Sequence, residues 1–190
     1  MTSRRAVVLA ALAIAPLSAL AQSQVHPPQQ QQQSQPPQAG ASAPLPPATT
    51  APLTEKNISM RMAMAIIDGV LEQCSKDGYR VSVVVVSNDG VLRAAVRGDG
   101  TAPHTVEFAR RKAYTARTRN MTSLAFQKQT DDPANAYLKQ IPEVVAVGGG
   151  VPIRVGNTPI GAVGVSGAPG GDKDEVCANA GIAKVADQLK

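Results

Sequence analysis

Residues 81–96 read VSVVVVSNDGVLRAAV, and this stretch decides the fold class. The nearly unbroken valines of 81–86 predict a strand that is covered on both faces. Asn88-Asp89-Gly90 is a tight-turn signal, and residues 91–96 continue as the returning strand of a hairpin. Because a hairpin joins antiparallel neighbours, we expect a largely antiparallel sheet.

The flanking segments extend this pattern over the whole domain. Apolar residues at steps of three and four predict a first helix that begins after Thr54, its N-cap, and ends at Asp77. Pro103 opens a basic helix over 106–119. The remaining expected elements are short helices over 123–128 and 134–139, strands over 144–147, 151–155 and 159–166, and a final helix over 172–190. This order, α-β-β-α-α-β-β-β-α, predicts an α+β fold, a three-layer α/β/α sandwich with a mainly antiparallel five-stranded sheet.

The N-terminus predicts an export signal. Arg4 and Arg5 precede an apolar run over 6–17, and Ala19-Leu20-Ala21 fits the small-x-small cleavage pattern. We therefore expect a signal peptide over 1–21 and a periplasmic or secreted protein. The apolar run is shorter than the ~20 residues that a spanning helix needs, so no stable membrane span is expected after cleavage.

Residues 22–53 differ in composition from the rest of the chain. They hold nine Gln, eight Pro and no charged residue. Such a segment buries too little apolar surface to offset its ordering entropy, so we expect a disordered Gln/Pro-rich spacer. Residues 54–190 then form one domain of ordinary size.

The two cysteines lie near the ends of this domain. Cys74 falls at the end of the first predicted helix and Cys177 near the start of the last. An even count in an exported chain permits one disulfide. The alternative is two separate buried thiols, which the sequence alone slightly favours.

His104 is the only histidine of the predicted domain, and it directly precedes the basic helix. A lone imidazole excludes a multi-histidine metal site but suits a single axial ligand of haem iron. Helical phasing puts Phe108 and Arg111 on its face, and guanidinium groups suit carboxylates such as haem propionates. The opposite face, expected to pack on the sheet, consists of Val106, Ala109, Ala113 and Ala116. The alternative is that His104 is an ordinary helix-cap or interface residue.

Two groups of glycines indicate close approaches of the backbone. Residues 148–150 are three glycines between two predicted strands, so no helix N-terminus follows them to bind phosphate. We interpret them as a bulged turn where backbone lies close to backbone or ligand. Gly161, Gly164 and Gly167 recur at every third position and indicate that a helix or another subunit packs closely there.

Other residues argue against several function classes. Ser166 lacks a GxSxG context and has no second histidine as a base, which argues against a serine hydrolase. Lys and Arg cluster at 110–119 rather than along a face interleaved with aromatics, and the chain has no Trp, so nucleic acid is not an expected partner. The acidic cluster of Asp172, Asp174 and Glu175 is interpreted as the favourable N-terminus of the last helix rather than a metal site.

Three stretches carry a family resemblance. The first is Asp99-Gly100 with Pro103-His104-Thr105 and RKAYTA at 111–116. The second is GGGVPI at 148–153 with IGAVGVSG at 160–167, and the third is DxDExCAxAG at 172–181. Together they resemble the GlcG/HbpS family of haem-binding and proposed haem-degrading proteins, over most of residues 54–190.

The resemblance implies a three-layer sandwich with an antiparallel sheet, and assembly into dimers or larger homo-oligomers. It also implies that some members bind haem or another tetrapyrrole. On this basis His104 is the expected ligand of the haem iron and Phe108 packs on the ring. Arg111 and Lys112 are the expected partners of the propionates.

The function expected from the sequence is therefore an exported haem-binding protein for haem sensing, storage or scavenging. One alternative is a haem-degrading or peroxide-consuming enzyme. That chemistry needs a proton donor near the iron, and Tyr114 is the nearby residue of that kind. The other alternative is an oligomer that is structural or binds a small molecule other than haem. Which residues would be catalytic is left open.

Overall fold

The structure, a computed structural model, describes residues 50–190. The predicted signal peptide and residues 22–49 of the predicted spacer lie outside the described residues. The elements in chain order are α1 (Met60–Lys76), β1 (Ser82–Ser87), β2 (Leu92–Arg97), α2 (Thr105–Arg119), α3 (Ser123–Gln129), the 3-10 helix η1 (Pro133–Gln140), β3 (Gly150–Val155), β4 (Thr158–Ser166), α4 (Gly171–Ala183) and the 3-10 helix η2 (Ala186–Gln188). None of the helices in this part of the chain is long and apolar enough to cross a bilayer.

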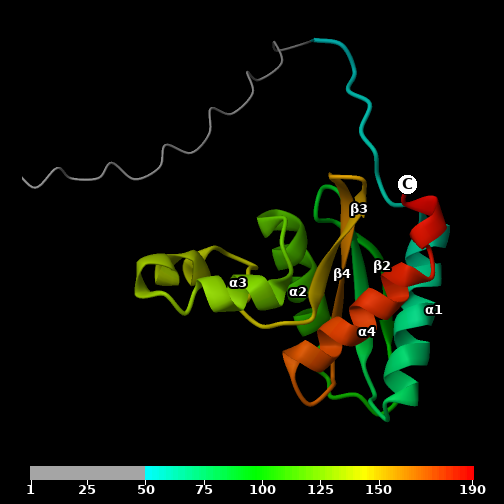
Figure 1. Ribbon diagram of the computed structural model, residues 1–190, viewed down its shortest axis with the longest axis vertical. Coiled ribbons are helices and arrows are strands. Elements are labelled where there is room, and N and C mark those ends of the chain that lie inside the picture. Colours follow the sequence, from blue (N-terminus) through cyan, green and yellow to red (C-terminus); the bar gives the residue numbers. More distant parts are fainter. Residues whose placement is uncertain (1–49) are drawn as a thin grey trace, which may run out of the picture. The chain divides into compact units, whose positions relative to one another are not determined.

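Within residues 50–190 the strands form one four-stranded sheet in the order β2-β1-β4-β3, shown in Figure 1. β1 and β2 are the hairpin predicted from 81–96, and β3 and β4 form a second hairpin. The two hairpins join through an antiparallel pair of β1 and β4, in which Val84 lies opposite Gly164. The prediction of an α+β fold with a mainly antiparallel sheet is confirmed.

The prediction of a fifth strand at 144–147 is wrong. Helix α2 binds the backbone of this segment through two side chains: Arg111 donates to the Val144 carbonyl at 3.0 Å, and the Thr115 hydroxyl accepts from the Val145 N–H at 2.8 Å. Backbone groups that are bonded to side chains in this way are not available for a strand ladder. The segment is therefore an irregular connection, and the sheet described here has four strands.

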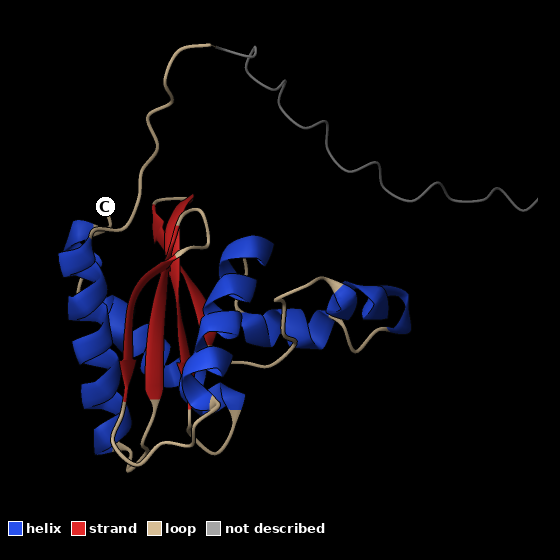
Figure 2. Cartoon of the chain, turned by 180° about the vertical axis from the view of Figure 1, so that it is seen from behind, coloured by secondary structure: helices blue, strands red, loops and turns tan. Residues whose placement is uncertain are grey.

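Helices pack on both faces of the sheet, as Figures 1 and 2 show. α1 and α4 lie side by side on one face, over the inward-pointing Val83 and Val85 of β1. α2 lies on the other face, over Val84 and Val86. Alternate residues of a strand point to opposite faces, so an unbroken valine run serves both cores, as predicted. The predicted packing face of α2 is confirmed by the burial of Ala109, Ala113 and Ala116.

The ends of the outer helices differ from their predicted positions. α1 begins at Met60, and its N-cap is Ser59, whose hydroxyl accepts from the Met62 N–H, instead of Thr54. The Ile58 N–H donates to the Ile160 carbonyl at 2.9 Å, which holds this segment extended along the sheet and prevents an earlier start. The last helix ends at Ala183, before the chain end that was predicted.

A disulfide joins the two helices that share one face of the sheet. Cys74 of α1 and Cys177 of α4 are bonded, both are fully buried, and their Cα atoms lie 5.5 Å apart. Side-by-side packing of the helices brings the two residues within the range that a disulfide requires. The slight preference for two separate thiols is therefore wrong.

Candidate functional site

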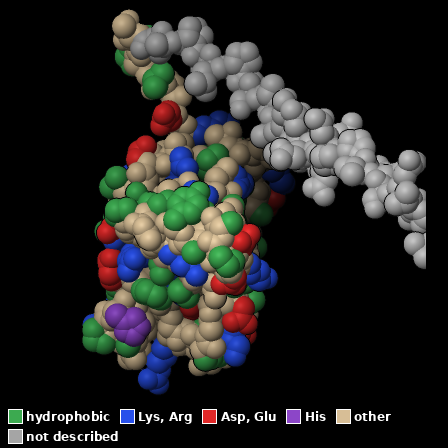
Figure 3. Space-filling model, turned by 90° about the vertical axis from the view of Figure 1, so that its left-hand side faces the viewer, with side chains coloured by type: hydrophobic (Ala, Val, Ile, Leu, Met, Phe, Trp, Pro, Cys, Tyr) green, Lys and Arg blue, Asp and Glu red, His purple; other side chains and the backbone are tan. Residues whose placement is uncertain are grey.

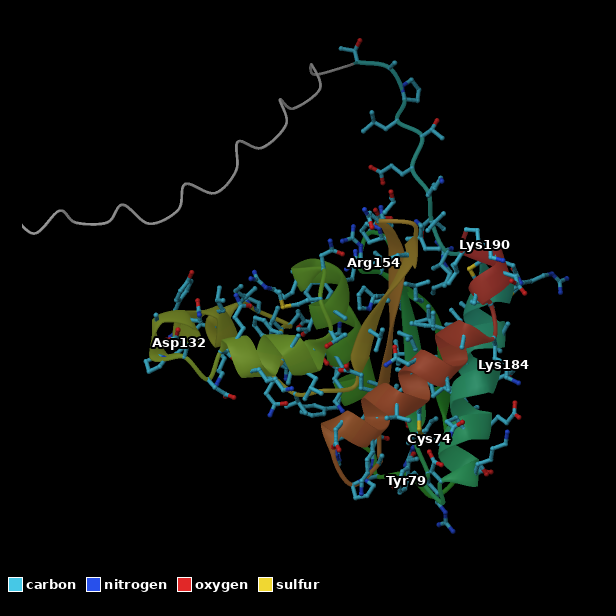
Figure 4. The ribbon with its side chains drawn as sticks, in the orientation of Figure 1. Cys74, Tyr79, Asp132, Arg154, Lys184 and Lys190 are labelled. Atoms are coloured by element: carbon cyan, nitrogen blue, oxygen red, sulfur yellow. A yellow bond between two sulfur atoms is a disulfide. The ribbon has the colours of Figure 1, made fainter. Side chains whose placement is uncertain are left out.

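A cleft of about 790 Å³ opens at the end of the sheet where β1 begins and β4 ends. It is lined by three loops, 78–80, 100–104 and 166–170, by Val147, by the side of α2 as far as Lys112 and by the first turn of α4. Tyr79, one of the lining residues, lies at the lower end of the sheet in Figure 4. The volume falls in the range of about 300–1,000 Å³ that is typical of small-molecule and cofactor sites.

His104 lies on this cleft, at the N-cap position of α2. Its side chain makes no capping hydrogen bond, and within residues 50–190 neither ring nitrogen has a hydrogen-bond partner. The imidazole is exposed, and Figure 3 shows it on the surface of the domain. Both ring nitrogens are thus available to a ligand.

Phe108 follows His104 by one helical turn and lies on the same cleft. The two ring centroids are 6.3 Å apart and the rings meet edge to face, with an interplanar angle of 75°. Phe108 is half-buried, so one part of its ring remains open to the cleft. The predicted juxtaposition of these two residues is found in the structure.

A buried hydroxyl network holds the loop that carries His104. The Ser82 hydroxyl lies 2.7 Å from that of Thr105 and 3.3 Å from that of Thr101. Thr105 also donates to the Ala102 carbonyl at 2.8 Å. All three hydroxyl residues are buried, and satisfied buried networks of this kind are rigid. The network therefore fixes the position of His104 relative to β1, and nothing in the sequence pattern indicated it.

Lys112, two turns after His104, lies at the floor of the cleft and is almost fully buried. Its ammonium donates to the Asp174 carboxylate at 2.7 Å and to the Val165 carbonyl at 3.0 Å. Asp174 also accepts from the Ala168 N–H at 3.0 Å. Burial raises the pKa of the Asp174 carboxyl, and the Lys112 ammonium partly opposes that rise. The expected propionate partner Lys112 thus has its charge matched by Asp174 within the protein.

Asp174 had been interpreted only as part of an acidic helix N-terminus. It does lie in the first turn of α4, as does Asp172. Its burial and its pairing with a residue 62 positions earlier give it a second role that the sequence analysis missed. One sequence signal could have indicated this pairing. Asp174 is a charged residue placed one turn before Cys177 and Ala178, which are both buried.

Arg111 does not lie on the cleft. Its guanidinium donates to the carbonyls of Glu143 and Val144, at 3.4 and 3.0 Å. At about 100° per residue, Phe108 and Lys112 are rotated about the axis of α2 by about 40° and 80° to one side of His104, and Arg111 by about 20° to the other side. The cleft lies on the side of Phe108 and Lys112, both of which line it. Arg111 is thus not among the residues that line the cleft, and the predicted grouping of Arg111 with His104 and Phe108 is not found there.

Tyr114 is also distant from the cleft. Its ring packs beside the buried cluster of Phe126, Leu138 and Val144, and it lies against the turn at Gly90. Tyr114 is therefore not placed as a proton donor for chemistry near His104.

The triple glycine forms a close backbone contact behind the floor of the cleft. Gly149 has φ +117°, and a Cβ there would lie 2.7 Å from the Val165 carbonyl oxygen and 3.0 Å from the Lys112 ammonium. The Val165 N–H donates to the Gly149 carbonyl at 2.9 Å. The predicted close approach of backbone is confirmed, whereas the register irregularities of the sheet lie at Val85/Val86 and Ile153/Arg154 and not at this turn. The absence of side chains here allows the Lys112–Asp174 pair to be packed against backbone.

A family model described as "Haem degrading protein HbpS-like" matches residues 58–183. The chain belongs to the HbpS-like family. The match includes every strand and α-helix of the described domain, and all of the cleft-lining side chains named above lie within it.

Similar proteins extend this assignment of the HbpS-like chain. Protein GlcG of Escherichia coli K12 is 33% identical over 113 residues, which cover 60% of this chain and 84% of GlcG. The crystal structure of a double mutant of Streptomyces reticuli HbpS is 34% identical, with a TM-score of 0.67, and covers 75% of this chain and 97% of that one.

A more distant structure shares the fold of this HbpS-like chain. The crystal structure of a PduOC:haem complex is 21% identical, with a TM-score of 0.61, and covers 67% of this chain and 94% of that one. At this identity the similarity concerns the fold alone.

Sites of another kind are not apparent in the described part of this HbpS-like chain. Across residues 50–190, no group of three or more His, Cys, Asp or Glu side chains is arranged to hold a metal ion. A second, smaller hollow of about 300 Å³ lies between α1 and α4, lined by Glu72, Lys76 and Lys184 among others. Glu72 is paired with both of these lysines. The cleft at His104 is therefore the best candidate for a binding site.

Proposed function

We propose that this chain is an exported haem-binding protein that holds haem or a related tetrapyrrole in the cleft at His104. The observation that carries the proposal is the exposed imidazole of His104. Both its ring nitrogens lack a partner in the described domain, and it lies on a cleft of cofactor size. Membership of a family described as haem degrading supports the same ligand.

The residues of the cleft fit the chemistry of haem in three respects. His104 would hold the iron through one ring nitrogen, which is a common role of neutral imidazole. Phe108 offers an apolar ring surface beside it. Gly167, Gly170 and Gly171 give the opposite wall little side-chain bulk, so a flat ligand can lie close to backbone.

Haem, when bound, would supply the redox-active iron. The residues around it bind and orient: the network of Ser82, Thr101 and Thr105 fixes the loop of His104, and Phe108 excludes water from one side. The Lys112 ammonium and the Asp174 carboxylate are paired at the floor of the cleft and add no net charge there.

Haem degradation is a second candidate function, because the family is described by that activity. Such chemistry needs a proton donor near the bound group. Lys112 lines the cleft and is bonded to Asp174, so it replaces Tyr114 as the residue to test. Bound haem whose spectrum stays unchanged with reductant or peroxide would reject this candidate.

Export and assembly are further parts of the proposal. The predicted signal peptide over 1–21 would place the protein in the periplasm or outside the cell, as a dimer or larger homo-oligomer. N-terminal sequencing of the exported protein should begin at Gln22, and light scattering should give a mass above that of one chain. An exported protein that retains residues 1–21 would reject the predicted cleavage. A mass of one chain would reject the homo-oligomer.

Haem binding itself is tested by adding haemin to the protein and passing the mixture through gel filtration. We expect a Soret band that co-elutes with the protein at a fixed ratio. Protein that elutes without Soret absorbance, with its oligomeric state intact, would favour an oligomer that does not use haem.

A further inference from the structure

Arg80 is a charged residue of the cleft that the sequence analysis did not consider. It lies between Tyr79 and β1, its side chain is exposed, and it lines the cleft. In the described part of the chain, no carboxylate pairs with its guanidinium and no acceptor receives a hydrogen bond from it. Lys112, by contrast, is neutralised by Asp174.

The position of Arg80 is set by its neighbours on the cleft wall. Its guanidinium lies across Gly100, where a Cβ would come within 2.8 Å of Nη1 and 3.4 Å of Cδ. Gly100 has φ +73° and belongs to the loop that leads to His104. The backbone of Arg80 lies close to that of Gly167 on the facing loop. The free guanidinium therefore lies on the rim formed by the same loop that carries the imidazole.

The charges on the cleft favour an anion at this rim. Apart from the Tyr79 phenol, the ionisable side chains that line the cleft are those of Arg80, His104, Lys112 and Asp174. The last two neutralise each other, so no carboxylate that lines the cleft is left to balance the Arg80 charge. A planar guanidinium binds carboxylates through two parallel hydrogen bonds, which an ammonium does not offer.

We propose that Arg80 binds a peripheral carboxylate of the cleft ligand, and that the cleft selects flat ligands that carry such a group. This inference rests on the proposed function and deepens it. It assigns to Arg80 the contact that the sequence suggested for Arg111 and Lys112, neither of which has a free charge on the cleft.

The test compares two probes on the full chain. Haemin carries two free carboxylates, and haemin dimethyl ester carries none. Both are titrated by absorbance into the wild type, Arg80→Ala, Arg80→Lys and the control Arg61→Ala. Arg61 is exposed in the first turn of α1, on the order of 20 Å from the end of the helix that leads to Arg80. Arg61→Ala therefore removes the same charge as Arg80→Ala and leaves the lining of the cleft unchanged.

Arg80→Ala should weaken haemin binding at least about tenfold and change the affinity for the ester by less than about twofold. Arg80→Lys should recover part of the loss, and Arg61→Ala should bind both probes as the wild type does. An unchanged haemin affinity of Arg80→Ala, or an equal loss for both probes, overturns the role of Arg80 and leaves haem binding standing. A wild type that binds neither probe overturns the proposed function together with it.

Discussion

The Lys112 ammonium and the Asp174 carboxylate lie 2.7 Å apart at the floor of the cleft, and only 2% and 3% of these side chains are exposed. The pair joins α2 on one face of the sheet to the first turn of α4 on the other. Additional hydrogen bonds to the Val165 carbonyl and from the Ala168 N–H help to offset the desolvation of both charges. The floor of the candidate site is thus also a tie between the two helical faces.

Removing one member of this pair should destabilise the fold strongly. Lys112→Met leaves the Asp174 carboxylate buried without its cation, and we expect the free energy of unfolding at neutral pH to fall by about 3–5 kcal/mol. Urea denaturation measures this. The double variant Lys112→Met with Asp174→Leu should lose less than the sum of the two single losses. As a control, Lys76→Met breaks the exposed pair with Glu72 and should change stability by less than about 1 kcal/mol. Equal effects at the buried and exposed pairs would be incompatible with this account.

The disulfide between Cys74 and Cys177 should contribute substantially to stability, because it closes a loop with a sequence separation of 103. Replacing both cysteines by alanine is expected to lower the free energy of unfolding by about 2–5 kcal/mol. Reductant should lower the stability of the wild type in denaturant and leave the double variant unchanged. If reductant acts equally on both proteins, or on neither, the bond does not stabilise the domain as described.

Gly164 should not tolerate a methyl group. Its added Cβ would overlap the Ala109 carbonyl oxygen, a backbone atom of α2 that cannot move without shifting the helix. We expect Gly164→Ala to lower the free energy of unfolding by about 3 kcal/mol or more. The control is Gly156→Ala, in a turn where φ is +57° and the Cβ would meet nothing, with an expected loss of about 1–2 kcal/mol. Thermal and urea denaturation measure the stability of both variants. If Gly164→Ala loses less stability than Gly156→Ala, α2 does not pack on β4 as described.

Glu72 should give the domain part of its acid sensitivity. Hydrogen bonds from Lys184 and Lys76 hold the pKa of Glu72 at about 2, below its ordinary value of 4.5. Because the folded pKa is the lower one, the contribution of Glu72 to stability is present above pH 4.5 and is lost as the pH falls towards 2.

The comparison for this effect is between the wild type and Glu72→Gln, with Tm measured from pH 5 to pH 2 at low salt. The variant should lack this part of the pH dependence. The pairs are exposed, so about 1 M salt should reduce the difference between the two proteins. Identical pH dependence at low salt would rule out the contribution of Glu72.

The sequence was sufficient for those elements whose signal is local. The valine run of β1, the Asn-Asp-Gly turn at 88–90 and the alanine face of α2 are each indicated by residues close together in the sequence, and each is confirmed. The segment 144–147 has the composition of a strand. Its irregular conformation depends on Arg111 and Thr115, whose side chains bind its backbone from a helix about thirty residues earlier. No local pattern contains that information.

The residues of the candidate site also differ in whether local sequence predicts their positions. His104 and Phe108 lie one helical turn apart, so phasing was enough to bring them together. Asp174 meets Lys112 across 62 positions, and Arg80 reaches the cleft from a different loop, so both depended on the tertiary fold. Helical phase alone places Arg111 nearly in line with His104, and its hydrogen bonds to the backbone of Glu143 and Val144, about thirty residues later, hold its guanidinium away from the cleft.

Whether haem binds in the cleft through His104 is measured by haemin titration of the wild type and His104→Ala. We expect the wild type to give a shifted Soret band with saturable binding. His104→Ala should lose that band position and bind haemin at least about tenfold more weakly, with unchanged thermal stability because the imidazole is exposed and makes no hydrogen bond in the described domain. An unchanged Soret band and affinity in His104→Ala would contradict binding through His104.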